Sequence, residues 1–260
     1  MFVFIIPLKS QTVSKDWNKT CWLFERTLRS VCNQTSTQFS VLVVCHEKPG
    51  IDFVSPQVQY VQVNFPPPNK DNTTDDKWYF KGDIDKNRKT LMGLYFARNL
   101  LPNYVMVVDA DDCVSNKLVK YAEKHPASNG WFFNQGYFYN QIYETLIFKY
   151  RKFNLMCGTS NIINYNLINL PDNPEYNRGY GYYRDHVIFL KHDHAKDVMA
   201  KQGNPLRPLP FPGAIYIIDN GENIYFRSDR SIYGSRLENL LGRRSITPQI
   251  REQFYLYSRS

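Results

Sequence analysis

The chain has 260 residues, of which 43% are apolar and 15% aromatic, and this composition excludes both a mini-protein and a mainly disordered chain. Thirty-two basic against twenty-four acidic residues give a net charge of +8, so we expect the surface to attract phosphates, nucleic acid or acidic lipid headgroups. The five cysteines are odd in number and form no CxxC pair, which favours free thiols and a cytoplasmic location over a disulfide framework.

The first half of the chain alternates between strand-like and helix-like segments. Short apolar runs predict strands at residues 2–8, 39–45, 104–108 and 131–139, and a further strand is expected at residues 57–63. Apolar residues that repeat at steps of three and four predict helices at residues 17–31, 88–102 and 115–124. This alternation predicts an α/β fold with a mostly parallel central sheet flanked by helices. The opening run is too short to cross a membrane or to form the core of a signal segment.

Caps and an irregular segment add detail to this pattern. Ser14 is expected to cap the first helix, with Asp16 in its first turn, and Ser115 is expected to cap the third helix. Residues 64–85 contain prolines and show no periodicity, which predicts a long loop of the kind that binds ligands.

The second half of the chain is less regular. Further elements are expected as a helix at residues 185–200 and as strands at residues 214–218 and 224–227. Residues 237–254 have a helical pattern that Gly242 and Pro248 interrupt. No linker, repeat or low-complexity tract divides the chain, so we expect a single domain.

Three carboxylates follow directly after the apolar strand at residues 104–108. Asp109 and Asp111 are two positions apart, so in an extended chain both face one pocket while Ala110 packs behind them. Ligands of parallel sheets bind at the carboxyl ends of the strands. Two close carboxylates need a cation between them or a raised pKa, and their oxygens favour Mg²⁺ or Mn²⁺ carrying a diphosphate. The alternative is that these aspartates only serve a turn and a helix N-terminus.

Four segments occur in an order that points to a known class of enzymes. They are FVFIIPLK, LRSVCNQTSTQFSVLVVCHEKP, DKNRKTLMGLYFARNLLPNYVMVVDADD and GYGYYRDHVIFL. Over about two-thirds of its length the chain thereby resembles the A-type nucleotide-sugar glycosyltransferases, in particular the family 2-like enzymes. The resemblance implies a GT-A-like domain over residues 1–260. Its parts would be a nucleotide-sugar-binding half at about 1–125, an acceptor-binding and catalytic half at about 126–236, and a basic C-terminal segment at 237–260.

The resemblance also implies a reaction, a cofactor and site residues. A sugar, of the hexosyl type, would move from a nucleotide-diphosphate donor, expected to be a UDP-sugar, to a hydroxyl of a glycan or lipid-linked acceptor, as in polysaccharide biosynthesis. Asp109, Ala110 and Asp111 would contact the nucleotide, and the two aspartates would hold Mn²⁺ or Mg²⁺. Pro7 and Leu8 would line the base pocket.

Two further places along the chain bear on the nucleotide. After the second strand many relatives carry an aspartate that contacts the nucleotide base, whereas this chain has Cys45, His46 and Glu47. The identity of the base is therefore left open. Basic residues lie just before the helix that leads into the acidic strand, and their side chains could supply a positive charge near the nucleotide phosphates. These residues are Lys86, Arg88 and Lys89. A solvated helix N-terminus accounts for the same residues equally well.

Asp185 stands where related enzymes carry the carboxylate that deprotonates the acceptor hydroxyl. An inverting transfer needs one such base on the face of the sugar opposite the leaving diphosphate. His186 is the second candidate because a neutral imidazole can accept the same proton. The alternative for Asp185 is a carboxylate in the first turn of a helix.

Other polar residues lie outside the acidic strand end and the proposed base. His192 and His194 are two apart on an expected helix and therefore face different ways, so we expect surface positions rather than a metal-binding pair. Cys157 to Ser160 form a small-residue turn suited to close approach of the backbone to a sugar, or to an ordinary connection. Asp219 and Asn220 follow an expected strand and are given no role.

Two alternative functions remain open. A nucleotidyltransferase could use the same acidic strand end, although the first strand lacks the glycine-rich phosphate loop expected after it. A basic nucleic-acid-binding module would use the net charge of +8, but no recognised binding motif occurs and the basic residues are scattered. We therefore expect no nucleic-acid partner. Contact with a membrane is expected to be peripheral at most, because the basic C-terminal segment lacks an apolar face.

Overall fold

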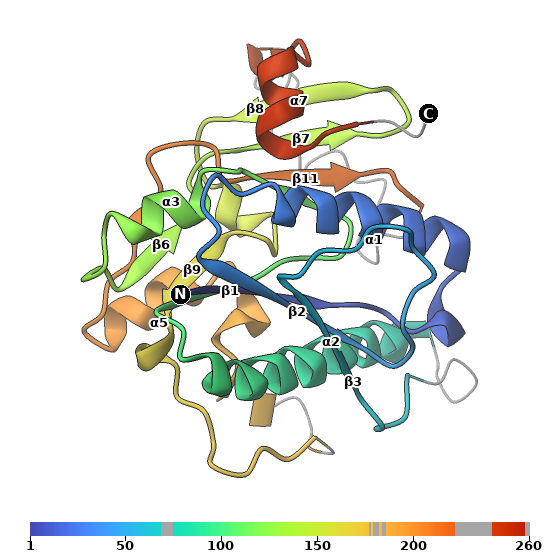
Figure 1. Cartoon of the computed structure of the whole chain (residues 1–260), viewed down its shortest axis with the longest axis vertical. Coiled ribbons are helices and arrows are strands. Elements are labelled where there is room, and N and C mark those ends of the chain that lie inside the picture. Colours follow the sequence, from blue (N-terminus) through green and yellow to red (C-terminus); the bar gives the residue numbers. More distant parts are fainter. Residues whose placement is uncertain (69–74, 177, 179–181, 184–185, 222–240, 258–260) are drawn as a thin grey trace.

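The computed structural model describes residues 1–68, 75–176, 178, 182–183, 186–221 and 241–257. Its central feature is a seven-stranded sheet (Figure 1). The strands are β1 (Phe2–Pro7), β2 (Phe39–Cys45), β3 (Val58–Gln62), β4 (Tyr104–Val107), β6 (Gly130–Phe132), β9 (Asn161–Asn164) and β10 (Arg207–Pro208). They lie in the order β10-β6-β9-β4-β1-β2-β3.

Most neighbours in this sheet are parallel. β1 pairs in parallel with β2 on one side and with β4 on the other, and β3 continues in parallel beside β2. β10 is parallel to β6, and only β9 runs antiparallel to its two neighbours, β4 and β6. The predicted α/β class with a mostly parallel central sheet is therefore confirmed.

A second sheet of five strands lies beyond α1 (Figure 1). Its strands are β12 (Arg243–Arg244), β8 (Thr145–Lys149), β7 (Gly136–Asn140), β11 (Ala214–Ile218) and β5 (Cys113–Val114), in that order. β7 and β11 are parallel, and the other pairs are antiparallel. Because β5 follows β4 after a short turn, the chain passes from the central sheet to the second sheet at the acidic segment.

Helices cover both faces of the central sheet. The described helices are α1 (Trp17–Cys32), α2 (Asp75–Ala97), α3 (Leu118–Glu123), α5 (Ala195–Lys201) and α7 (Pro248–Phe254). Short 3-10 turns occur at Gln11–Val13, Arg98–Leu100, Phe153–Leu155, Tyr165–Leu167 and Ile188–Lys191. Side chains alternate between the two faces of β1. Phe4 belongs to the hydrophobic cluster that contains the buried face of α1, and Ile5 belongs to the cluster that contains the buried face of α2, so each long helix covers one face of the sheet.

α2 comes unusually close to the central sheet at Gly93. A Cβ atom at this position would lie 2.5 Å from Cγ2 of Ile5, so any larger residue would push the helix away from β1. The close contact fixes the height of α2 above the carboxyl end of β1, where the polar residues of the helix begin.

Several predicted boundaries are wrong. Residues 131–139 belong to two strands in different sheets rather than to one strand. β6 ends at Phe132, and β7 begins at Gly136, whose Cβ would lie 2.5 Å from the Phe153 ring. The loop predicted at 64–85 is wrong from Asp75 onward, where α2 begins, whereas residues 64–68 are irregular as predicted. Apolar periodicity marks only the part of α2 that packs on the sheet, so its polar first turns gave no signal.

The remaining differences concern helix ends. Asp16, not Ser14, caps α1, because its side chain accepts a hydrogen bond from the backbone N–H of Lys19. α3 is shorter than predicted, and the helix predicted at 185–200 is confirmed only as α5 after a 3-10 turn. Pro248 begins α7 instead of interrupting a helix, with Thr247 as the cap. The strand predicted at 224–227 lies outside the described residues.

All five cysteines are free thiols, as predicted. None of the helices in the described part of the chain has the length and apolarity to cross a bilayer.

Candidate functional site

The acidic segment lies where the order of the central sheet reverses. The chain enters at β1, adds β2 and β3 on one side, and then returns to add β4 on the other side of β1. At such a point the connections from two neighbouring strands leave in opposite directions, so a crevice opens at their carboxyl ends. Asp109 and Asp111 follow the carboxyl end of β4 within this reversal.

Asp109 is held from two sides. Its carboxylate forms an ion pair with the ammonium group of Lys86 on α2, and its backbone N–H donates to Oγ1 of Thr159 over 2.9 Å. A Cβ atom at Gly158 would lie 2.6 Å from Oδ2 of Asp109 and 3.3 Å from Nζ of Lys86. The small-residue turn at 157–160 therefore allows close approach, and the group that approaches it is this ion pair.

Asp111 is held by residues from distant parts of the chain. Nδ2 of Asn220 donates to its Oδ2 over 2.7 Å, and Nη2 of Arg26 donates to its backbone oxygen over 3.3 Å. Burial, followed by the charge of Asp109, raises the pKa of Asp111, while the Asn220 hydrogen bond and the charges of Lys9 and Arg26 act in the opposite direction. The charge of Asp109 thus opposes ionisation of Asp111, and the shared pocket expected for the two carboxylates stays a prediction.

Asp112, the third carboxylate, has a structural position. It is 0% exposed and accepts hydrogen bonds from Oγ1 of Thr159 over 2.6 Å and from the backbone N–H of Ile217 over 3.1 Å. Sγ of Cys157 lies 3.4 Å from the same carboxylate. Burial and the neighbouring carboxylates raise its pKa well above the ordinary value. The hydrogen bonds of Asp112 therefore connect residues 109–112, which we call the acidic turn, to β11 and to the turn that contains Gly158.

His192 faces inward, so the surface position predicted for it is wrong. Burial, and then the charge of Lys86, lowers the pKa of His192, whereas the charge of Asp109 acts in the opposite direction. Its Nε2 is buried and has no hydrogen-bond partner among the described residues. His194 is exposed and lies 3.4 Å from Asp193, as expected for a surface residue.

No cluster of three or more His, Cys, Asp or Glu side chains arranged to hold a metal ion occurs within the described ranges. A divalent ion held by Asp109 and Asp111 would have these two carboxylates as its ligands from the described residues. This donor set fits an ion of the Mg²⁺ or Mn²⁺ kind, which is commonly held by one or two carboxylates together with substrate phosphates and waters.

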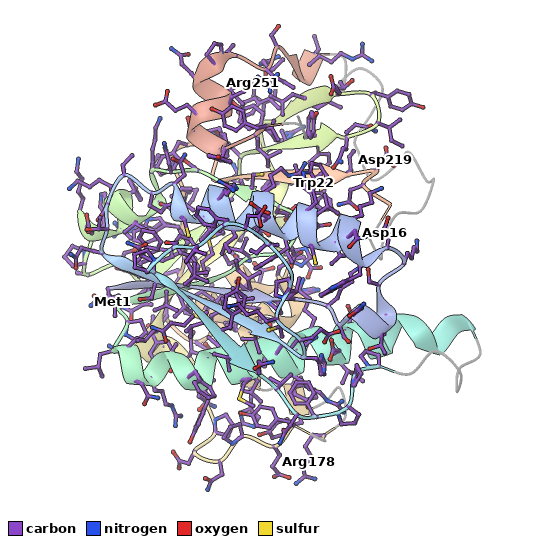
Figure 2. All side chains as sticks on the ribbon, turned by 45° about the vertical axis from the view of Figure 1, so that its right-hand side comes forward. Met1, Asp16, Trp22, Arg178, Asp219 and Arg251 are labelled. Atoms are coloured by element: carbon purple, nitrogen blue, oxygen red, sulfur yellow. The ribbon has the colours of Figure 1, made fainter. Side chains whose placement is uncertain are left out.

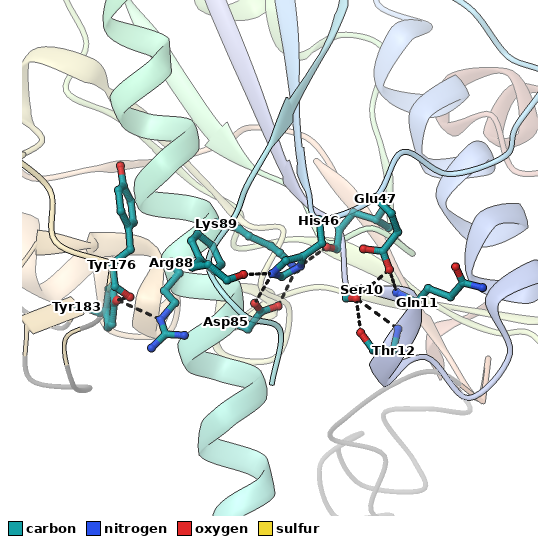
Figure 3. Close-up of polar contacts among 12 residues, drawn as sticks. Ser10, Gln11, Thr12, His46, Glu47, Asp85, Arg88, Lys89, Tyr176 and Tyr183 are labelled. Atoms are coloured by element: carbon teal, nitrogen blue, oxygen red, sulfur yellow. Dashed lines mark hydrogen bonds and ion pairs between the residues drawn. The ribbon is translucent and has the colours of Figure 1, made fainter. Parts of the chain in front are cut away.

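A second polar cluster lies at the carboxyl ends of β1 and β2 (Figure 3). Lys89 is 1% exposed, and its ammonium group donates to the oxygen of Leu8 over 2.8 Å and to Oδ2 of Asp85 over 2.7 Å. Nε2 of His46 donates to the oxygen of Phe65 over 2.9 Å. Lys89 therefore joins α2 to the end of β1, and its amine points into the protein rather than toward a phosphate.

The cations predicted near the phosphates separate into three environments. Lys86 lies at Asp109, Lys89 is buried, and Arg88 lies beside Phe65 and Tyr183, with Nε 3.4 Å from the Tyr183 hydroxyl (Figure 3). Of the three, only Lys86 contacts the acidic turn in the described structure. It was not distinguishable from the other two in the sequence, because all three lie within one turn of a helix.

The carboxylate of Glu47 binds the loop that follows β1. Its Oε1 accepts hydrogen bonds from Oγ of Ser10, over 2.8 Å, and from the backbone N–H of Gln11 (Figure 3). The side chains predicted to line a base pocket, Pro7 and Leu8, are buried at the end of β1. Their role in base binding stays a prediction.

Burial, and then the charge of Lys89, lowers the pKa of His46 below its ordinary 6.5. Between the lowered value and 6.5 the unfolded chain binds more protons than the folded chain, so the free energy of unfolding falls as the pH falls through this window. We expect His46→Gln to lose this part of the acid sensitivity in urea titrations at a series of pH values. His194→Gln, which removes an exposed imidazole, is the control. An unchanged pH profile in His46→Gln would contradict the account.

The predicted catalytic residues are only partly described. Asp185 lies outside the described residues. His186 is half-buried, its ring centroid lies 4.7 Å from that of Tyr182, and its Nδ1 is buried with no partner among the described residues. Ala110 is half-buried and packs against the core beneath the acidic turn.

No family model matches the chain, and no curated protein matches it in sequence. The solved structures with a similar backbone include the following two. A structure of TarS 1–349 from S. aureus is 12% identical with a TM-score of 0.41, and the match covers 83% of this chain but only 60% of the TarS structure. The 2-C-methyl-D-erythritol 4-phosphate cytidylyltransferase IspD from Francisella tularensis is 11% identical with a TM-score of 0.39, covering 91% and 99% of the two chains. At these values neither similarity assigns an activity.

Proposed function

We propose that the chain is a metal-dependent, inverting glycosyltransferase that moves a sugar from a UDP-sugar to a hydroxyl of a glycan or lipid-linked acceptor. The observation that supports this most is the pair of carboxylates, Asp109 and Asp111, at the reversal point of the parallel sheet. Both are fixed by contacts from other elements, through Thr159 and Asn220. Two neighbouring carboxylates need compensation. Lys86 pairs with Asp109, the pKa of Asp111 is raised, and a divalent ion bound between the two would compensate both negative charges.

In this proposal Asp109 and Asp111 hold Mn²⁺ or Mg²⁺, with the phosphates of the donor completing the ligand set. The chemistry that such an ion supplies when bound is stabilisation of the charge on the leaving diphosphate. Lys86 supplies a second positive charge at the same carboxylate. His192 has a buried Nε2 with no hydrogen-bond partner among the described residues, and the charges of both Lys86 and Asp109 act on the pKa of its ring.

Asp185 is the proposed base, with His186 as the alternative. The acceptor oxygen attacks the anomeric carbon while the bond from that carbon to the diphosphate oxygen breaks, and the hydroxyl proton passes to the carboxylate of Asp185. The bond-forming and bond-breaking oxygens lie on opposite faces of the sugar, so its configuration inverts. No covalent sugar intermediate is required.

Lys86 and Arg88 provide a matched test of the phosphate contact. We expect Lys86→Gln to weaken nucleotide binding about tenfold, because it removes a charged hydrogen-bond donor from the acidic turn. Arg88→Gln removes the same charge from α2 but beside Tyr183, so its dissociation constant is expected to stay within about twofold of the parent. Calorimetric titration with UDP and Mn²⁺ measures both. Equal losses in the two variants would mean that only the overall charge matters.

A thermal-shift screen tests the proposed function. The full chain is heated with nucleoside diphosphates, nucleoside triphosphates and UDP-sugars, each with and without Mn²⁺. The proposal predicts stabilisation by a diphosphate or nucleotide sugar that depends on Mn²⁺ and is lost in Asp111→Asn. Stabilisation by triphosphates alone would indicate a nucleotidyltransferase. No shift with any nucleotide would contradict both.

A further inference from the structure

An open cavity of about 520 Å³ lies on the second sheet, outside the acidic turn at the end of β4. Its walls come from the start of β8, from β12 and the residues after it, and from α7. Three arginines line it, Arg243, Arg244 and Arg251, together with one carboxylate, Glu144. Figure 2 shows Arg251 on α7, the helix that packs at the outer end of the molecule. The volume is within the range of small-ligand sites.

The positive charge of this cavity is not neutralised by the described chain. Arg251 donates to the oxygen of Leu256 over 3.2 Å, and Arg244 donates to the oxygen of Leu241 over 2.9 Å, both of which are neutral acceptors. Among the residues that the structure describes, none of the three arginines forms an ion pair, even with Glu144. Three guanidinium groups and one carboxylate therefore share one open cavity, which favours an anionic ligand.

Arg244 is also held in place before any ligand binds. It donates to the hydroxyl of Tyr150, and its guanidinium lies 5.7 Å from the ring centroid of Phe148 and 5.6 Å from that of Tyr150. A guanidinium fixed in this way loses less freedom on binding than a solvated one. The planar group matches two oxygens of a phosphate with parallel hydrogen bonds.

We propose that this cavity binds phosphate groups of an acidic polymer. Three arginines in one cavity suit a ligand that presents more than one phosphate, and the open shape admits a chain that continues past the site. The binding itself is independent of the enzymatic activity proposed above. Its biological role rests on that activity: the polymer would be the acceptor, a phosphate-bearing glycan or lipid-linked precursor.

The cavity is connected to the acidic turn through the hairpin of β7 and β8. At the end of β7, Asn140 donates to Asp219, which Figure 2 places at the end of β11, and the next residue, Asn220, donates to Asp111. In the same hairpin Gln141 accepts from Nη1 of Arg26 over 3.4 Å. Nη2 of that arginine donates to the backbone of Asp111. The hairpin thus has the cavity on one side and the acidic turn on the other.

The test is calorimetric titration of the full chain with a short linear inorganic polyphosphate, in buffer containing EDTA so that no divalent ion is present. Arg243→Gln is the main variant because its exposed side chain has no hydrogen bond in the described structure. Arg244→Gln is the second variant. Arg207→Gln is the control, since it removes an equally exposed arginine from β10 in the other sheet. We expect each cavity variant to bind about tenfold more weakly and the control to bind within about twofold of the parent.

Three results would overturn the proposal. They are the absence of binding, equal weakening in Arg207→Gln, and binding only to vesicles of phosphatidylcholine with phosphatidylserine, which would indicate a membrane surface. The same proteins are also tested with UDP and Mn²⁺. If polyphosphate binds in the cavity while no nucleotide binds anywhere, the cavity proposal stands and the glycosyltransferase proposal fails. If Arg243→Gln keeps the nucleotide response and loses only polyphosphate, the two sites are separate, as proposed.

Discussion

Replacing Asp111 by asparagine is expected to lower sugar transfer at least about 100-fold. The substitution keeps the size of the side chain, and an amide oxygen can still accept the hydrogen bond from Asn220. What it removes is the negative charge that, with Asp109, would hold the divalent ion. The substitution should therefore lower the rate of sugar transfer and change its dependence on Mn²⁺ concentration, with little effect on the melting temperature. Steady-state assays with a UDP-sugar across Mn²⁺ concentrations measure it.

Asp52→Asn is the matched control for this variant. Asp52 is exposed in the loop before β3, so the same change of charge occurs away from the acidic turn. Its transfer rate is expected to stay within about twofold of the parent. A similar rate in Asp111→Asn and Asp52→Asn would show that the acidic turn takes no part in transfer.

Replacing Asp112 by alanine is expected to lower the free energy of unfolding by about 3 kcal/mol or more. The variant leaves the backbone N–H of Ile217 and the hydroxyl of Thr159 without their buried acceptor. Asp112→Asn is expected to cost less. Because burial raises the pKa of Asp112, a neutral amide resembles the protonated carboxyl that the fold favours. Urea titration followed by fluorescence measures both variants.

An exposed aspartate serves as the control for the loss of one negative charge, so that the effect of the lost hydrogen bonds on the free energy of unfolding can be measured separately. Asp172→Ala removes a carboxylate from the surface and is expected to change the free energy of unfolding by less than about 0.5 kcal/mol. If Asp112→Ala were as stable as Asp172→Ala, the hydrogen bonds of the carboxyl to β11 and to Thr159 would contribute nothing to the fold. The acidic turn would then need another support.

The acidic turn was predictable because its signals are local. The apolar run at 104–108 marks a buried strand, and the aspartates after it mark the strand end that faces ligands. β1, β2 and β11 were predicted for the same reason, as short apolar runs between polar segments. Periodicity likewise identified α1, since one of its faces packs on the central sheet.

The supports of the acidic turn were not predictable because their partners are distant in sequence. Asn220 is 109 positions from Asp111, and Arg26 reaches the same residue across 85 positions. Nothing in the neighbourhood of either residue marks such a contact. His192 was assigned to the surface because its spacing from His194 was the only signal available, and a 3-10 turn that ends at the preceding residue changes where it faces. The division of 131–139 between two sheets was not predicted, because both β6 and β7 are rich in aromatic residues.

The most direct test of the central claim is electron paramagnetic resonance of Mn²⁺ in the presence of UDP. Free hexaaqua Mn²⁺ gives a sharp signal, and binding to a protein site broadens it. The account predicts that the parent chain removes about one ion per chain from the free signal, beyond what UDP removes alone, and that Asp109→Asn and Asp111→Asn do not. Equal removal of free Mn²⁺ by the parent and by both variants would contradict the claim that these two carboxylates hold the ion.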